Sequence, residues 1–183
     1  IDDGCYDIIF FREQDSTLLW GPDQTGLPIP YRVFTIHQLR PPYKIRFGEQ
    51  LTFFTIKVQP WANAHFFSTL QQPGIIDLLP THPELADAHL GLLGQTPVEG
   101  KFARADALMA GREQILRPAA QWVRTICEVI YRERGMTSVQ ALSDHFGRSR
   151  QYMNRVFRQE VLYSLKQFIL TVRIMDLVKY RMR

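Results

Sequence analysis

The side chains best suited to chemistry lie close together near the carboxyl end of the 183-residue chain. Gln151, Asn154, Arg155 and Arg158 follow i, i+3, i+4 and i+7 spacing, which places them on one face of a helix. Arg hydrogen-bonds to guanine in the major groove of DNA, and Asn or Gln to adenine. Residues 148–159 contain no Asp or Glu, whereas an ordinary solvated helix face often carries Glu and Lys pairs. The pattern therefore favours a helix that reads DNA.

Two short helices joined by a glycine are expected to present this face. Thr137 or Ser138 is a natural N-cap for the first helix, and Gly147 permits the left-handed turn that ends it. Ser149 then caps the second helix. The apolar residues of each helix share one face, namely Val139, Leu142 and Phe146 in the first and Met153, Val156 and Phe157 in the second. This is the sequence form of a helix-turn-helix.

The charge of the chain is concentrated in the same region. Residues 137–183 hold nine Lys and Arg against three acids, a net charge of +6. The whole chain carries +4, so residues 1–136 carry −2. This asymmetry is typical of a scaffold or sensor joined to a module that binds a polyanion, although charge alone leaves a solvated cationic face equally open.

The remaining sequence predicts an α+β fold. Short runs rich in β-branched and aromatic residues are separated by Gly and Pro turns, at residues 6–11, 32–38, 44–47 and 51–58. They indicate an antiparallel β-rich domain, a small barrel or a sheet, followed by an all-helical region. Helices are expected at residues 62–70, within 80–97 and at 119–134, with 98–111 as connecting structure. The predicted domains are a β-rich sensor or dimerisation domain (1–95), a connector (96–117) and a partial helix-turn-helix domain (118–183).

Residues 138–174 resemble the first helix-turn-helix of AraC-type transcriptional regulators. The most specific parts are Arg155-Val156-Phe157-Arg158 and Ser164-Leu165-Lys166-Gln167-Phe168. Residues 3–10 more loosely resemble the entry strand of the β-rich N-terminal domain in one AraC subgroup. Leu162 and Leu165 stand where the family usually has Gly and Pro. Residues 168–183 resemble the family's linker helix, so the second helix-turn-helix of the family is expected to be missing from this sequence.

The resemblance implies a regulator that binds double-stranded DNA. Gln151, Asn154 and Arg155 would face bases, while Arg150, together with Arg148 and Arg158, would contact phosphates. The N-terminal domain would bind a small-molecule effector, form a homodimer, or both. We expect the dimer to form through residues 1–95.

An effector pocket is a separate hypothesis, based on the aromatic residues that concentrate between positions 20 and 61. Such residues suit an apolar ligand site, but they would equally fill a core. The pocket hypothesis takes Arg32, His37 and Arg46 as polar anchors, and Phe53 and Trp61 as lining residues.

No sequence motif indicates an enzyme, a metal site or a cofactor. The histidines do not form a cupin-like His-x-His pattern, and Cys5 and Cys127 are far apart, as suits a reducing cytoplasm. No apolar run reaches the ~18–20 residues of a membrane helix. The predicted function is therefore regulation of transcription in the cytoplasm. The alternative is a small-molecule-binding or protein-interaction module whose basic helices bind an anion other than DNA.

Overall fold

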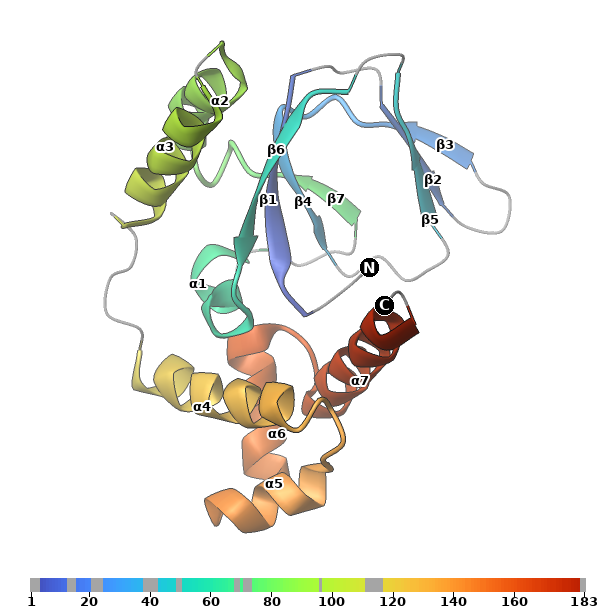
Figure 1. Ribbon diagram of the computed structural model, residues 1–183, viewed down its shortest axis with the longest axis vertical. Helices are drawn as coiled ribbons and strands as arrows, with labels where there is room; N and C mark the ends of the chain where they lie inside the picture. Colours follow the sequence, from blue (N-terminus) through green and yellow to red (C-terminus); the bar gives the residue numbers. More distant parts are fainter. Residues whose placement is uncertain are drawn as a thin grey trace. The chain divides into compact units, whose positions relative to one another are not determined.

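The computed structural model describes residues 4–12, 16–20, 25–37, 43–48, 51–67, 70, 74–95, 97–110 and 117–181. The chain divides into two compact units, whose elements are labelled in Figure 1. The β unit comprises Asp7–Lys57 and Leu70–Gln114. The helical unit comprises Ile1–Tyr6, Val58–Thr69 and Ile115–Arg183. Two short segments from the N-terminal half of the chain thus belong to the helical unit.

The larger sheet of the β unit has the strand order β6-β1-β4-β7. Its strands are β1 (Tyr6–Phe11), β4 (Val33–His37), β6 (Phe53–Val58) and β7 (Gly74–Asp77). β4 is antiparallel to both neighbours, with Phe34 opposite Ile9 in β1 and Asp77 in β7. Val33, Phe34 and Thr35 are fully buried, which is possible only because both faces of this central strand are covered.

The smaller sheet of the β unit has the order β3-β2-β5 and is also antiparallel. Its strands are β2 (Thr17–Trp20), β3 (Thr25–Pro28) and β5 (Tyr43–Arg46). Phe11, Leu18, Ile29 and Phe34 form a buried core, in which the Phe11 and Phe34 rings meet edge to face with centroids 4.8 Å apart. The sequence patterns did not predict β2, β3 or β7. These are four-residue strands, whose formation depends on their partners more than on their own composition.

Two helices follow the larger sheet in the chain, α2 (Leu85–Leu93) and α3 (Val98–Ala110). α3 occupies the segment that was expected to connect two domains, and it is instead a regular helix that packs on α2 within the β unit. Its alanines favour helix, and its Phe102 ring lies 5.7 Å from that of Phe54 on β6. Only Ala105 of α3 is buried, which explains why its amphipathic pattern is weak.

The helical unit is built around one buried core. Its elements are the 3₁₀ turn η1 (Pro60–Ala62), α1 (Asn63–Phe67), α4 (Pro118–Arg132), α5 (Val139–Phe146), α6 (Arg150–Val161) and α7 (Leu165–Arg181). Buried residues from four helices meet in the core: Val123, Ile126, Cys127 and Ile130 of α4, Leu142 of α5, Met153, Val156, Phe157 and Val161 of α6, and Leu165, Phe168, Ile169 and Val172 of α7. Burial raises the pKa of the Cys127 thiol, so this cysteine remains protonated.

Gly135 allows α7 to approach the turn between α4 and α5. Its φ of +69° is left-handed, and a Cβ atom there would lie 2.5 Å from the backbone nitrogen of Arg173. The Arg173 side chain donates hydrogen bonds to the carbonyls of Gly135, at 2.8 Å, and Thr137, at 3.3 Å. The start of the helix-turn-helix is therefore fixed to α7.

The structure confirms the predicted α+β class, with antiparallel sheets followed by helices. The compact units are not consecutive segments like the three predicted domains, because Ile1–Tyr6 and Val58–Thr69 belong to the same unit as the late helices. None of the helices in the described residues combines the length and apolar character needed to cross a membrane.

Candidate nucleic-acid interface

Side-chain caps fix the ends of the two helices of the motif. Ser138 accepts a hydrogen bond from the Ala141 amide at 3.0 Å and caps α5. Gly147 ends α5 in the left-handed conformation, with φ +60°. Ser149 caps α6 by accepting from the Tyr152 amide at 3.3 Å. Each cap satisfies a helix N–H that would otherwise lack a partner, so these short helices begin at defined residues.

A further hydrogen bond holds the turn between the helices. The Ser143 hydroxyl, on the buried side of α5, donates to the Arg148 carbonyl at 2.6 Å. The next helix, α6, buries Met153, Val156 and Phe157 in the core. The opposite face of α6 is consequently exposed, and its orientation is set by the core and the turn together.

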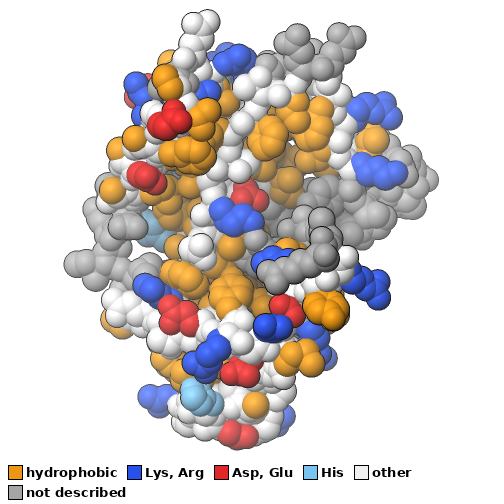
Figure 2. Space-filling view, viewed as in Figure 1, with side chains coloured by type: hydrophobic (Ala, Val, Ile, Leu, Met, Phe, Trp, Pro, Cys, Tyr) orange, Lys and Arg blue, Asp and Glu red, His pale blue; other side chains and the backbone are white. Residues whose placement is uncertain are grey.

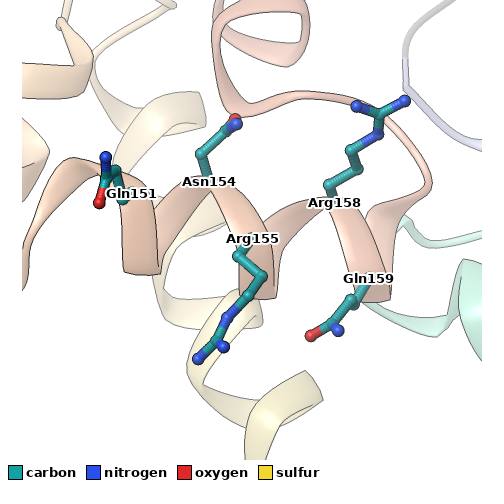
Figure 3. A pocket seen from close by; sticks show the side chains of 5 residues that line it. All are labelled: Gln151, Asn154, Arg155, Arg158 and Gln159. Atoms are coloured by element: carbon teal, nitrogen blue, oxygen red, sulfur yellow. The ribbon is translucent and has the colours of Figure 1, made fainter.

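The six residues predicted to contact DNA are all exposed. Figure 3 shows Asn154 and Arg158 projecting to one side of α6, Arg155 and Gln159 to the other, and Gln151 near the first turn. These five residues line an open pocket of about 520 Å³. Arg148 and Arg150 lie just before and at the start of α6, outside this pocket. The predicted base-reading residues therefore share one surface, with arginines at both of its ends.

The charge of this surface is not neutralised within the protein. Among the described residues, no carboxylate forms an ion pair with Arg148, Arg150, Arg155 or Arg158. The acidic residue of α6, Glu160, is only 5% exposed, and its Oε2 atom lies 3.0 Å from the Arg117 guanidinium. This acid points away from solvent, so the exposed face of α6 is left with positive charge and amides.

Tyr152 is a member of this surface that the sequence analysis missed. The guanidinium carbons of Arg148 and Arg155 lie 5.8 and 5.5 Å from the centre of its ring. The ring also packs on Trp122 of α4, with centroids 5.7 Å apart. A cation over an aromatic face is stabilised by about 0.5–1 kcal/mol at exposed sites. Tyr152 therefore positions the side chains of two arginines and is itself supported by α4. Arg148 and Arg155 lie four residues before and three residues after Tyr152 in the sequence, and this helical spacing could have revealed the contacts.

Asn154 has a structural partner that its spacing on α6 did not reveal. Its Oδ1 atom accepts a hydrogen bond from the backbone amide of Leu165, the first residue of α7, at 3.2 Å. Ser164 and Gln167 complete the cap, since the Gln167 amide donates to Ser164 Oγ and the Ser164 amide to Gln167 Oε1. Asn154 thus joins the second helix of the motif to the start of α7.

The residues of the hypothetical effector pocket belong to both units of the chain. Arg32, Arg46 and Phe53 are exposed, and His37 is buried in β4, where burial lowers its pKa. Trp61 belongs to the helical unit, with the Arg124 guanidinium 5.5 Å from its ring centre. None of the five lines the pocket on α6 or a second one of about 590 Å³, formed by Ala64, His65, Arg117, Gln159 and Glu160.

Potential metal ligands are dispersed. Within the described ranges, no three His, Cys, Asp or Glu side chains come close enough together to hold a metal ion. Comparison of the chain with protein-family models, with curated proteins and with solved structures gives no match.

Proposed function

We propose that this chain is a sequence-specific, DNA-binding transcription regulator of the AraC type, in which α6 enters the major groove. The observation that carries the proposal is the exposed face of α6. It presents amides and three arginines, with Arg148 just before the helix, and none of the four arginines has a carboxylate partner among the described residues. A glycine turn and a serine cap fix the start of this helix. DNA supplies both the phosphates and the base-edge acceptors that such a face lacks.

The residues divide into three roles in this proposal. Gln151 and Arg155 read base edges, because both residues are exposed and their side chains form no hydrogen bond with other described residues. Arg148, Arg150 and Arg158 contact phosphates. For Asn154 we propose a positioning role beside the base reading predicted from the sequence, because its Oδ1 atom accepts a hydrogen bond from the Leu165 amide at the start of α7.

The β unit is proposed to bind an effector or to form the homodimer. Phe47 and Phe53 support this proposal, since they are 41% and 54% exposed while both of their rings lie beside Phe11. Large exposed aromatic side chains that adjoin one another are typical of binding surfaces. Sedimentation of the chain at high micromolar concentration should show a dimer, and a monomer would contradict this part of the proposal.

The salt dependence of DNA binding tests the main proposal. Fluorescence anisotropy of a labelled duplex should report an affinity that falls as salt rises, because bound arginines release counterions from the phosphates. Three phosphate contacts predict a slope of about −2.7 in log K against log salt, or a loss of about 40-fold between 50 and 200 mM. The alternative, a module for other anions, predicts no preference for duplex DNA over a small anion of equal charge.

Matched arginine variants localise the binding to α6. Arg150→Ala should make the slope shallower by about 0.9. Arg132→Ala removes an exposed arginine of α4 that is paired with Glu133, and it should leave the slope unchanged. Equal effects of the two variants would mean that only the total charge matters, and the proposal for α6 would fail.

A further inference from the structure

The helical unit contains a buried asparagine that comes from a distant part of the sequence. Asn63, the first residue of α1, is fully buried. Its Nδ2 atom donates two hydrogen bonds, to the Gly4 carbonyl at 3.2 Å and to the Val161 carbonyl at 3.0 Å. These acceptors lie 59 and 98 positions away in the sequence. One side-chain amide therefore joins three segments of the chain.

The acceptor on α6 is a carbonyl that needs a partner. Val161 is the last residue of α6, and Leu162 follows in the left-handed conformation with φ +66°. The Leu162 amide returns to the Arg158 carbonyl, but the carbonyls of a final helical turn have no intrahelical donors. Asn63 supplies a donor to one of them. It acts as a C-terminal cap that is provided by another part of the fold.

Aromatic packing keeps this cap in place. The Tyr6 ring lies 5.3 Å from that of Phe67 in α1 and 5.5 Å from that of Tyr163, just after α6. Phe67 is completely buried and Tyr6 is 2% exposed. The Phe168 ring of α7 lies against Gly4, where an added Cβ atom would be only 2.4 Å from it. The segments that carry Asn63 and Gly4 therefore pack against the end of α6 and the start of α7.

An asparagine at this buried position lowers the stability of the fold unless its hydrogen bonds compensate for the burial of its polar atoms. Its Oδ1 atom is buried and has no hydrogen-bond partner among the described residues. A buried polar atom without a partner is unfavourable, and an apolar residue would avoid it. The two bonds from Nδ2 are the compensating gain, and one of them goes to the proposed DNA-reading helix.

We propose that Asn63 is a positioning residue for DNA binding, which fixes the C-terminal end of α6. This inference rests on the function proposed above. Arg158 and Gln159 lie in the last turn of α6, next to the capped carbonyl, whereas Gln151 lies in the first turn. Loss of the cap should therefore loosen the contacts made by the end of the helix more than those made by its start.

The test compares two truncations in the full 183-residue chain. Asn63→Ala removes the cap, while Val172→Ala shortens a buried side chain of the same core on α7. The probe is the best-bound duplex selected by the wild-type chain from a randomised 20-base-pair library, with an unselected duplex as the non-specific reference. Thermal unfolding followed by circular dichroism identifies a temperature at which the wild type and each variant are all folded, and binding is measured there. If Asn63→Ala does not fold, Asn63→Ser, which retains one donor, takes its place.

Three readouts decide the matter. With the fold intact, Asn63→Ala should lower the ratio of variant to wild-type affinity for the selected duplex by about five- to tenfold, as expected for the loss of one or two hydrogen bonds. It should also make the salt slope shallower, because the loosened contact is that of Arg158 with a phosphate. Val172→Ala should leave this ratio unchanged. Hydrogen exchange of the amides at residues 158–163 should accelerate in Asn63→Ala and not in Val172→Ala. An unchanged ratio, or equal losses in the two variants, would overturn the positioning role.

The exchange readout separates this inference from the proposed function. If the wild-type chain selects no duplex, the proposed function fails, and the exchange rates still show whether Asn63 holds the end of α6. If exchange at residues 158–163 is the same in both variants, the capping role itself is wrong, whatever the DNA result.

Discussion

Replacement of Asn154 separates a structural role from base reading at one position. Asn154 is exposed on α6, yet its Oδ1 atom accepts from the Leu165 amide at the start of α7. Only the carbonyl end of the side chain can accept this bond. Asn154→Asp keeps the acceptor and removes the amide donor, whereas Asn154→Ala removes both. A contact with adenine needs both the donor and the acceptor.

The expected change in stability follows from the loss of the hydrogen-bond acceptor for the Leu165 amide at the start of α7. Leu165 is fully buried, so its N–H has poor access to water once Asn154 is shortened. Loss of this bond should cost about 1 kcal/mol of unfolding free energy. The aspartate variant should match the wild type or exceed it by about 0.3–1 kcal/mol, because a negative charge near a helix N-terminus is favourable.

Urea denaturation and DNA binding together provide the assay. Asn154→Asp should weaken binding to all duplexes, since it adds negative charge near phosphates, but a positioning role alone predicts a ratio of specific to non-specific affinity within about twofold of the wild type. Base reading by Asn154 predicts instead a loss of about 5- to 150-fold in this ratio. Such a loss would show that Asn154 also reads a base, and an alanine variant as stable as the wild type would refute the positioning role.

Three further outcomes are expected. In urea denaturation, Gly135→Ala should lower the unfolding free energy by clearly more than Gly147→Ala. Both glycines have positive φ, but only a Cβ atom at position 135 would meet backbone atoms. Equal losses in the two variants would contradict this packing. Tyr152→Leu should weaken specific binding by about two- to fivefold, through loss of the aromatic contacts to two arginines, while Tyr152→Phe retains affinity; anisotropy measures both. Burial lowers the pKa of His37, so the chain takes up a proton at this residue when it unfolds at low pH. The unfolding free energy should therefore fall as the pH drops below 6.5, the ordinary pKa of histidine. His37→Gln should flatten this pH dependence, and an unchanged dependence in the variant would contradict the role of His37.

Local patterns were sufficient to predict the helix-turn-helix. The caps at Ser138 and Ser149 and the turn at Gly147 involve only residues three or four positions away. Neighbouring residues in the sequence are therefore enough to predict them. The exposed face of α6 follows from a 3.6-residue period and from the buried positions that alternate with it. These are the parts of the candidate site for which sequence and structure agree.

Contacts between distant segments could not be predicted in this way. The bond from Asn63 to Val161 spans 98 positions, and nothing near Asn63 in the sequence distinguishes it from a surface residue. Asn154 has the spacing of a base reader, but its bond to α7 depends on the left-handed residue Leu162, which turns the chain back. In the smaller sheet, β2 and β3 form through pairing, since β3 contains both Gly26 and Pro28.

α7 exposes a row of large hydrophobic side chains, whereas the exposed face of α6 carries arginines and amides. On the face shown in Figure 2, hydrophobic side chains lie beside basic ones over α7. Leu170, Ile174 and Leu177 are each 47–59% exposed, and Tyr180 is 79% exposed. DNA binding by α6 predicts that apolar changes along this row leave the salt slope unaltered, because the slope counts phosphate contacts.

Selection from a randomised duplex library tests the central claim most directly. The wild-type chain should enrich a defined sequence, and Gln151→Ala should enrich the same sequence with the preference at a single base pair relaxed, at a cost of about 1–3 kcal/mol for that pair. Position-specific relaxation would place the side chain of Gln151 against one base. No enrichment by the wild-type chain, or an identical profile for the variant, would contradict the account of α6 as a helix that reads DNA.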